Sequence, residues 1–161
     1  MSTGELQGLY QQVILDHARE KHGFGLSPDT APDAASHQVN PTCGDEITLN
    51  VHLAPDGLTV SRLAWEGQGC SISQASASLL SDLAPGLDVP GLHERVDAFR
   101  LAMRSKGTIE PDEELLGDAV VLGGTSRYIA RVKCAMLAWV ALEAALQELP
   151  PAAAAPAPPA V

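Results

Sequence analysis

Apolar residues recur every three or four positions near the start of the chain, which predicts an amphipathic helix over about residues 4 to 20. The positions on its apolar face are Leu6, Leu9, Tyr10, Val13, Ile14 and His17. After this helix, residues 23 to 41 are rich in Gly, Pro, Asp and Ala and show no sustained period. We therefore expect a long surface loop there, which leads to Cys43.

A clean alternation of apolar and polar residues over 46 to 53 predicts a half-buried strand. Residues 55 to 57, Pro-Asp-Gly, favour a tight turn, so 58 to 66 is expected to return as an antiparallel strand. Within this return strand the apolar positions change phase between Val60 and Leu63. The change indicates either a bulge or burial of both faces, and the pattern does not choose between them.

Helical spacing resumes directly after the second cysteine. Ser71 or Ser73 can cap this helix, which ends at the Pro-Gly pair 85–86. Cys70 is therefore predicted to lie at a helix N-terminus.

Two more amphipathic helices are predicted further along the chain. Apolar residues from 92 to 103 define the first of them. The last and longest runs from about 126 to 148, with Thr125 or Ser126 as its cap, and it carries Cys134.

Composition limits the domain count and the class of partner. The length of 161 residues suits one ordinary globular domain, assigned to residues 1–149. Residues 150–161 contain only Pro, Ala and a terminal Val, so we expect a disordered, partly extended tail. Lys plus Arg number 10 against 20 Asp plus Glu, and the net charge of −10 would repel a phosphate backbone. Neither nucleic acid nor an anionic membrane is an expected partner.

Cysteine usage and the lack of a targeting signal indicate a compartment. The N-terminal segment has no basic stretch before an apolar run, and no segment approaches the roughly 18 apolar residues of a membrane-spanning helix. Three cysteines, an odd number, do not suit a disulfide framework and are typical of a reducing environment. We therefore expect a soluble protein of the cytoplasm.

The three cysteines are the main candidate chemistry of the chain. Cys43 precedes a predicted strand, Cys70 precedes a helix and Cys134 lies on a helix, so they can converge at one edge of the sheet. With Asp45 they would form a four-coordinate set that Zn²⁺ accepts. No C-x-x-C pair is present, so spacing alone supports a metal only weakly. Small, buried, hydrophobic cysteines are the alternative interpretation.

Such a centre needs a nearby cation. Three thiolates and one carboxylate around Zn²⁺ carry a charge of about −2. On the last predicted helix, Arg131 shares a face with Arg127 and Cys134, whereas Lys133 points to the side. Arg131 is therefore the natural candidate for the cation that offsets the negative charge of the centre.

Other residues offer weaker chemistry. The histidines suit structural or solvated positions better than ligand positions; they are His17, His22, His37, His52 and His93. A Ser/Cys–His hydrolase is the remaining enzyme class, but no nucleophile elbow or protease signature surrounds any cysteine.

Four motifs give the chain a resemblance to a known family. They are LYQQVILDH at 9–17, NPTCGD at 40–45, GCSISQASAS at 69–78 and RVKCAMLAW at 131–139. Together they resemble the SufU branch of the IscU/NifU N-terminal family of iron–sulfur cluster assembly, over about residues 6 to 148. The resemblance implies a SufE/NifU-like α+β fold, in which a small, mainly antiparallel three-stranded sheet packs against about five helices. The third strand would lie near residues 67 to 72.

The same resemblance implies roles for particular residues. The family's metal ligands align with Cys43, Asp45, Cys70 and Cys134, and Arg131 matches an arginine typical of the SufU branch.

The chain also departs from the family pattern. Lys133 stands where the IscU branch has a metal-site histidine, and the LPPVK segment that binds chaperones in that branch is missing upstream of Cys134. Both departures disfavour a scaffold role. Residues 18–25, AREKHGFG, replace the Asn-Pro-Arg-Asn-like turn that is usual in SufU.

The implied function is that of a zinc-dependent sulfurtransferase. Such a protein accepts persulfide sulfur from a SufS-type cysteine desulfurase and passes it to a Suf cluster scaffold. Cys43 is the expected acceptor, because zinc keeps it deprotonated and the loop before it lets it move, whereas Cys70 and Cys134 are fixed on helices. The alternatives are a scaffold on which the same four residues hold a [2Fe–2S] cluster, and a purely structural zinc module.

Overall fold

The described part of the chain consists of a three-stranded antiparallel sheet, five α-helices and two 3₁₀ segments. The computed structural model describes residues 3–157. The strands, in spatial order, are β1 Ala34–Asn40, β2 Asp45–Leu53 and β3 Val60–Gln68. The helices are α1 Thr3–Glu20, α2 Ser71–Leu83, α3 Val89–Arg104, α4 Glu113–Leu116 and α5 Ile129–Gln147, with 3₁₀ segments η1 Gly117–Arg127 and η2 Pro151–Ala154. The predicted α+β class is confirmed.

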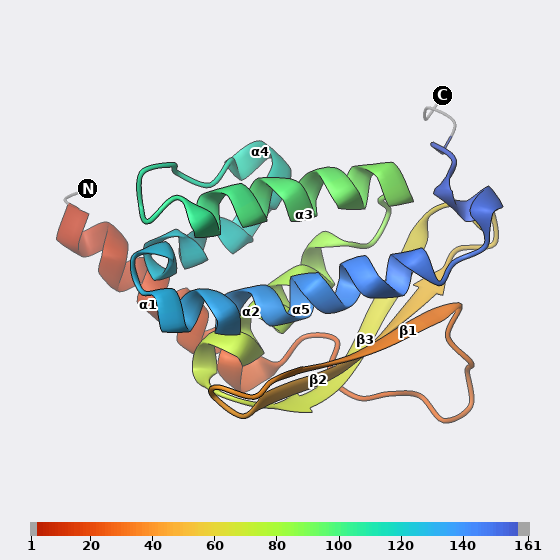
Figure 1. Ribbon diagram of the computed structural model, residues 1–161, viewed down its shortest axis with the longest axis horizontal. Helices are drawn as coiled ribbons and strands as arrows, with labels where there is room; N and C mark the ends of the chain where they lie inside the picture. The colour runs from red at the N-terminus through yellow and green to blue at the C-terminus, as the bar shows by residue number, and fades with distance from the viewer. Residues whose placement is uncertain (1–2, 158–161) are drawn as a thin grey trace.

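Helix α5 occupies the centre of the molecule. It packs against β1 and β2 on one side and against α2 and α3 on the others. Figure 1 shows the sheet below α5 and α3 above it. The ring of Phe99 stacks on that of Trp139 between α3 and α5, with centroids 4.0 Å apart and an angle of 5° between the planes. The apolar core therefore holds α5 in place from three directions.

The third strand lies elsewhere than predicted. Residues 34–40, expected within a loop, form β1 and pair with β2 from Ala34–Val51 to Asn40–Asp45. The segment reads AASHQVN. Its apolar residues are two alanines and one valine, which are too small or too far apart to show a clear alternation. The strand expected near 67 to 72 is wrong, because β3 ends at Gln68 and α2 begins at Ser71.

Strand β3 has both a bulge and burial on its two faces, the two explanations offered for the change of phase in its apolar positions. The register with β2 shifts between His52 and Leu53, opposite Ser61. Trp65 is also buried, because Phe24 packs edge-on against it at 5.0 Å. A bulge and burial on both faces therefore occur in the same strand.

Two helices begin at other residues than predicted. The N-cap of α2 is Cys70, and the Ser73 hydroxyl donates to the Cys70 carbonyl instead of capping. Helix α5 begins at Ile129, after an extended Tyr128. The two predicted caps, Thr125 and Ser126, are buried within η1.

The end of the chain is partly ordered where a disordered tail was expected. Residues 151–154 form η2, in which Ala153 is buried. The N–H of Ala157 donates to Asp88 and lowers the pKa of that carboxyl. Residues 158–161 lie outside the described part of the chain, and the domain boundary at residue 149 stays a prediction.

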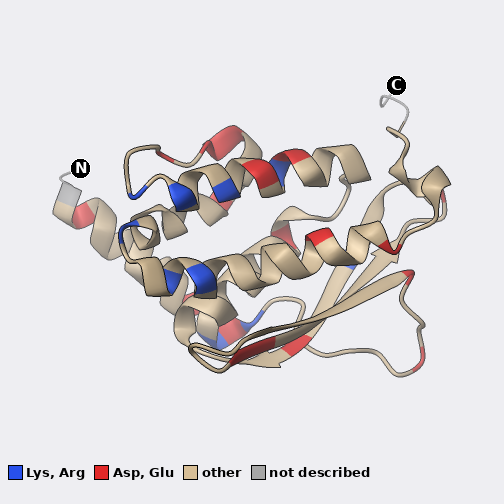
Figure 2. Cartoon of the chain, in the orientation of Figure 1, with Lys and Arg blue, Asp and Glu red and all other residues tan. Residues whose placement is uncertain are grey.

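Charged residues are spread over the surface, with cations at the beginning of α5 (Figure 2).

Among residues 3–157, no helix combines the length and the apolar character needed to cross a bilayer.

Candidate metal centre

Three separate segments bring the predicted ligands together. Cys43 lies in the turn between β1 and β2, and Asp45 is the first residue of β2. Cys70 caps α2, and Cys134 lies in the second turn of α5. In Figure 1 the β1–β2 turn and the beginnings of α2 and α5 lie at one end of the molecule.

Gly44 shapes the turn that carries Cys43. Its φ of 72° lies in the left-handed region, which glycine adopts without strain. Its N–H donates to the carbonyl of Asn40 at 2.9 Å, and the N–H of Thr42 donates to Asn40 Oδ1 at 3.3 Å. The turn therefore directs the side chains of Cys43 and Asp45 toward the same point.

Asp45 is the hub of the cluster. Its side chain is 1% exposed, and its Oδ1 accepts the backbone N–H of Cys70 at 3.1 Å. Its Oδ2 accepts the Cys43 thiol at 3.1 Å and lies 4.0 Å from the sulfur of Cys70. One carboxylate thus joins the sheet to the start of α2.

Cys134 completes the cluster from the opposite side. Its sulfur lies 3.5 Å from that of Cys43, and the residue is 5% exposed. Burial raises the pKa of the Cys134 thiol above its usual range, and hydrogen bonds with the other three donors raise it further. A divalent cation reverses this preference, because it favours the thiolate over the thiol.

The donor set fits a tetrahedral zinc ion. Zinc bonds of about 2.3 Å to sulfur and about 2.0 Å to oxygen separate the ligand atoms by about 3.5–3.8 Å. Three of the six separations are 3.1, 3.5 and 4.0 Å and bracket that range, and the donor atoms of Cys43, Asp45 and Cys134 all lie within 4.8 Å of one another, whereas the sulfur of Cys70 lies outside that group. The residues present therefore suit the ion, and their ligand role stays a prediction.

A groove of about 1040 Å³ gives access to the sulfurs. Cys43, Cys70 and Cys134 lie on its wall, opposite apolar side chains of α1. Cys43 and Cys70 are exposed and Cys134 is buried. A partner can therefore approach the first two sulfurs from solvent.

Arg131 lies on the same groove as the cysteines. It is exposed, and its guanidinium carbon sits 5.8 Å from the centre of the Tyr128 ring. Arg127 also lines the groove but belongs to η1, so it does not share a helix with Arg131 and Cys134 as predicted. The exposed Lys133 lines a separate hollow beside β1.

Gly69 is a further residue of the site, which no sequence pattern indicated. A Cβ at this position would overlap Asp45 Oδ1 and the hydroxyl of Ser73. Only hydrogen fits between the hub carboxylate and the first turn of α2. The Gly-Gln-Gly run before Cys70 signalled a chain break, but a close approach to Asp45 depends on tertiary structure.

We expect Gly69→Ala to displace Asp45 and weaken the centre. Overpacking of this kind costs about 1–3 kcal/mol of unfolding free energy, and disturbance of groups around a metal lowers its affinity about tenfold or more. Urea unfolding and competition with a chromogenic zinc chelator measure the two effects. Gly8→Ala on α1 is the matched control, since nothing lies within 4 Å of its added Cβ. Equal zinc affinity in both variants would contradict the close-approach argument.

Among the remaining histidines, His52 lies on β2 as predicted and is 5% exposed. Burial lowers the pKa of His52, and the positive charge of Arg62 lowers it further. His37 lies 3.2 Å from Glu46 on the sheet. Neither is part of the cysteine cluster.

Comparisons with known proteins agree with the fold and the motifs. Residues 9–135 match the model of the NifU-like N terminal domain. The chain is 40% identical over 142 residues to the zinc-dependent sulfurtransferase SufU of Bacillus subtilis, covering 88% of this chain and 91% of the relative. It is 33% identical over 147 residues to the iron–sulfur cluster assembly scaffold protein IscU of Streptococcus pyogenes, covering 91% and 88%.

A solved structure shows the same architecture. It is a putative iron–sulfur cluster assembly scaffold protein for the SUF system from Fervidobacterium islandicum, with a TM-score of 0.70 and 29% identity over 87% of this chain and 98% of that one. The family model spans most of the chain, and a relative more than one third identical is covered almost in full. This chain therefore belongs to the family of the NifU-like N-terminal domain.

Proposed function

We propose that this protein is a zinc-dependent sulfur acceptor of iron–sulfur cluster assembly, in which Cys43 receives sulfur. The observation that carries the proposal is the asymmetry of the four donors. Asp45 and Cys134 are buried, Cys43 and Cys70 are exposed, and of the two exposed cysteines only Cys43 lies on a short turn between strands. The names of the relatives from Bacillus subtilis and Streptococcus pyogenes support the pathway.

Cys43, Asp45, Cys70 and Cys134 would hold the zinc ion. When bound, zinc favours thiolates at neutral pH and protects them from oxidation. The chain contributes the geometry: Asp45 fixes the position of Cys70 through its backbone N–H, and α5 presents Cys134 from the core.

In the transfer step, the thiolate of Cys43 attacks the outer sulfur of a persulfide on the partner. A new S–S bond forms on Cys43, and the S–S bond of the partner breaks. The electron pair of the broken bond stays on the partner's cysteine, which leaves as a thiolate. No outside oxidant or reductant is needed.

The freedom of Cys43 comes from the turn between β1 and β2. The loop over 23 to 41 was expected to supply it, but residues 34–40 are paired in β1. Only residues 41–44 lie between the strands. Cys134 lies within α5, and Cys70 is the N-cap of α2, whose backbone N–H is held by Asp45. This contrast favours Cys43 as acceptor.

Arg131 would act on the approaching sulfur. Its exposed guanidinium lies on the wall of the groove that holds the cysteines, anchored over Tyr128. A positive charge there attracts an anionic persulfide and offsets the negative charge of the centre. This is the role we assign to it.

The partners follow from this chemistry. A SufS-type cysteine desulfurase supplies the persulfide, and a Suf cluster scaffold receives the sulfur. Three free thiols in one chain fit the reducing cytoplasm, where we place the reaction.

Metal analysis of anaerobically purified protein, combined with a desulfurase assay, tests the proposal. We expect at least one zinc per chain, no visible absorption and faster cysteine turnover by the desulfurase. Removing zinc with a chelator should abolish the stimulation, and adding zinc back should restore it. Stimulation that persists without zinc would contradict a zinc-dependent role.

The runner-up function is a scaffold for a [2Fe–2S] cluster. The same donors fit cluster iron, and the streptococcal relative bears a scaffold name. Iron and sulfide that transfer to an apo-acceptor would favour this function. A structural zinc module would show neither stimulation nor cluster transfer.

A further inference from the structure

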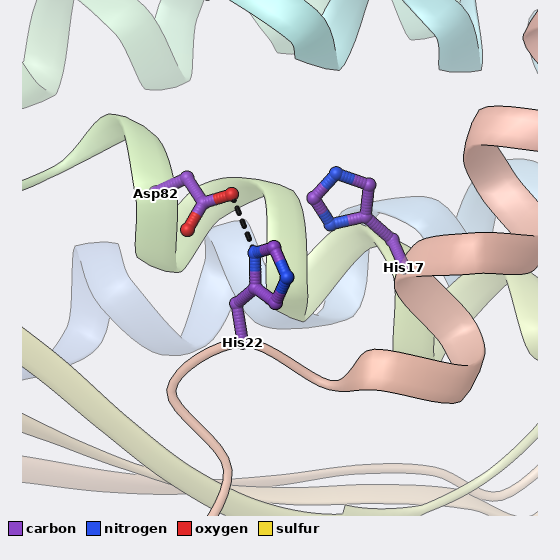
Figure 3. Close-up of side chains that lie close together, drawn as sticks. All are labelled: His17, His22 and Asp82. Atoms are coloured by element: carbon purple, nitrogen blue, oxygen red, sulfur yellow. Dashed lines mark hydrogen bonds and ion pairs between the residues drawn. The ribbon is translucent and has the colours of Figure 1, made fainter.

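A second cluster of metal-ligating side chains lies where the end of α1 meets the end of α2. His17 belongs to the last turn of α1, His22 follows that helix, and Asp82 lies near the end of α2 (Figure 3). Each offers one donor atom, and these three atoms lie within 4.8 Å of one another. Figure 3 shows the two imidazole rings next to each other and tilted, with Asp82 beside His22.

The individual contacts are those of a compact ligand set. His22 Nδ1 lies 2.7 Å from Asp82 Oδ2, and its Nε2 lies 3.1 Å from Glu20 Oε1. The His17 and His22 ring centroids are 4.7 Å apart. A nitrogen and an oxygen bound to one zinc-sized ion are about 3.3 Å apart, so a small rotation of the exposed Asp82 admits the ion.

The surroundings hold both histidines in position. The Ser78 hydroxyl lies 2.7 Å from His17 Nδ1 and accepts the backbone N–H of His22 at 2.8 Å. The carbonyl of His22 accepts the Trp65 indole N–H at 2.8 Å. Ser78 keeps the His22 N–H as a partner when the His17 nitrogen turns to an ion. The site is therefore largely built before any ion arrives.

Electrostatics at this cluster favour a cation. The carboxylates of Asp82 and Glu20 raise the pKa of His22 above its usual range. The faces of His22 are bordered by His17 and Glu20 from α1 and by Asp82 from α2. A proton satisfies these carboxylates at low pH, and a divalent ion can replace that proton when the imidazole is neutral.

The cluster is independent of the cysteine centre. Cys70 caps the beginning of α2 and Asp82 lies near its end, which places the two sites about 18 Å apart along that helix. Segment 18–25, which contains His22, is one of the parts of the chain that depart from the family pattern, whereas His17 is the last residue of the motif at 9–17. The site is therefore a feature of this chain rather than of the motifs around the cysteines.

We propose that His17, His22 and Asp82 bind a divalent transition-metal ion of the borderline class, such as Co²⁺, Ni²⁺ or Zn²⁺. Two imidazoles and a carboxylate are ligands that such ions accept, with water completing the shell. The side chains of His22 and Asp82 are 37% and 52% exposed, which leaves an entry path. The ion would fasten the end of α1 to the end of α2.

Cobalt titration of the full chain, with zinc already bound at the cysteines, tests this site. We expect one additional Co²⁺ per chain by equilibrium dialysis, with weak visible bands and no sulfur-to-cobalt charge transfer. Paramagnetic shifts should appear on the ring protons of His17 and His22. His22→Gln and Asp82→Asn should each weaken this binding by roughly tenfold or more.

His37→Gln is the matched control, because His37 pairs with Glu46 on the sheet and is exposed. Its Co²⁺ affinity should equal that of the unmodified chain. Absence of a second ion, or equal affinity in His22→Gln, would overturn the proposal. Sulfur-to-cobalt charge-transfer bands would show that cobalt has bound at the cysteines, and such cobalt does not count as the additional ion. Circular dichroism verifies that each variant is folded, and the exposed Asp82 makes Asp82→Asn the safest of them.

Discussion

Cys43→Ser is expected to abolish stimulation of the cysteine desulfurase while the variant remains folded and still binds zinc. The reason is that the four donors have different roles. Asp45, Cys70 and Cys134 remain to hold the ion, whereas serine has no thiolate to attack a persulfide. Desulfurase turnover should fall to the level without added protein. Mass spectrometry of the unmodified protein after reaction should find the extra sulfur on Cys43.

Two comparisons make this result specific. Thr42→Ala changes the exposed neighbour in the same turn and should keep full stimulation. Cys134→Ser removes a buried ligand and should lose zinc together with stimulation. Full stimulation by Cys43→Ser would end the assignment of Cys43 as acceptor, whatever its zinc content.

Trp139→Ala should produce a large loss of stability. Trp139 is 0% exposed and stacks on Phe99, and its indole N–H donates to the Ser76 hydroxyl at 2.9 Å. Truncation of a buried aromatic residue costs about 3–5 kcal/mol, out of a total of about 5–15 kcal/mol for a typical domain. Urea unfolding followed by circular dichroism measures the change.

Two further variants separate the causes of that loss. Trp139→Phe keeps a ring against Phe99 but removes the donor to Ser76, so it should cost less than the alanine variant. Leu101→Ala truncates a side chain of α3 that is 58% exposed and should change the unfolding free energy by about 0.5 kcal/mol or less. Similar losses for Trp139→Ala and Leu101→Ala would contradict the central position of α5 in the core.

The sequence predicted those elements whose residues alternate between apolar and polar types. Strand β2 shows this alternation and packs on α5, although Asn50 and His52 on its polar face are buried as well. Strand β1 did not, since its interior residues are small or polar and it forms by pairing with β2. Pairing partners distant in sequence leave no local period, which explains the wrong position of the third strand.

The candidate centre was predictable in its residues but not in its geometry. Motifs around Cys43, Cys70 and Cys134 pointed to one cluster, which the structure brings together. The contact of Gly69 with Asp45 arises only when β2 meets α2, so no sequence period marks it. The pairing of His22 with Asp82 likewise joins residues that are far apart in the chain.

Strand β1 borders solvent along one side, because it is hydrogen-bonded only to β2 within the sheet. Its last residue, Asn40, leads directly into the turn that carries Cys43. Outer strands fray from their ends, and an ion bound at this turn would hold one such end in place. Release of Cys43 to a partner would therefore also loosen the tip of the β1–β2 hairpin. The free energy needed to free the sulfur would then include the free energy of opening the end of β1.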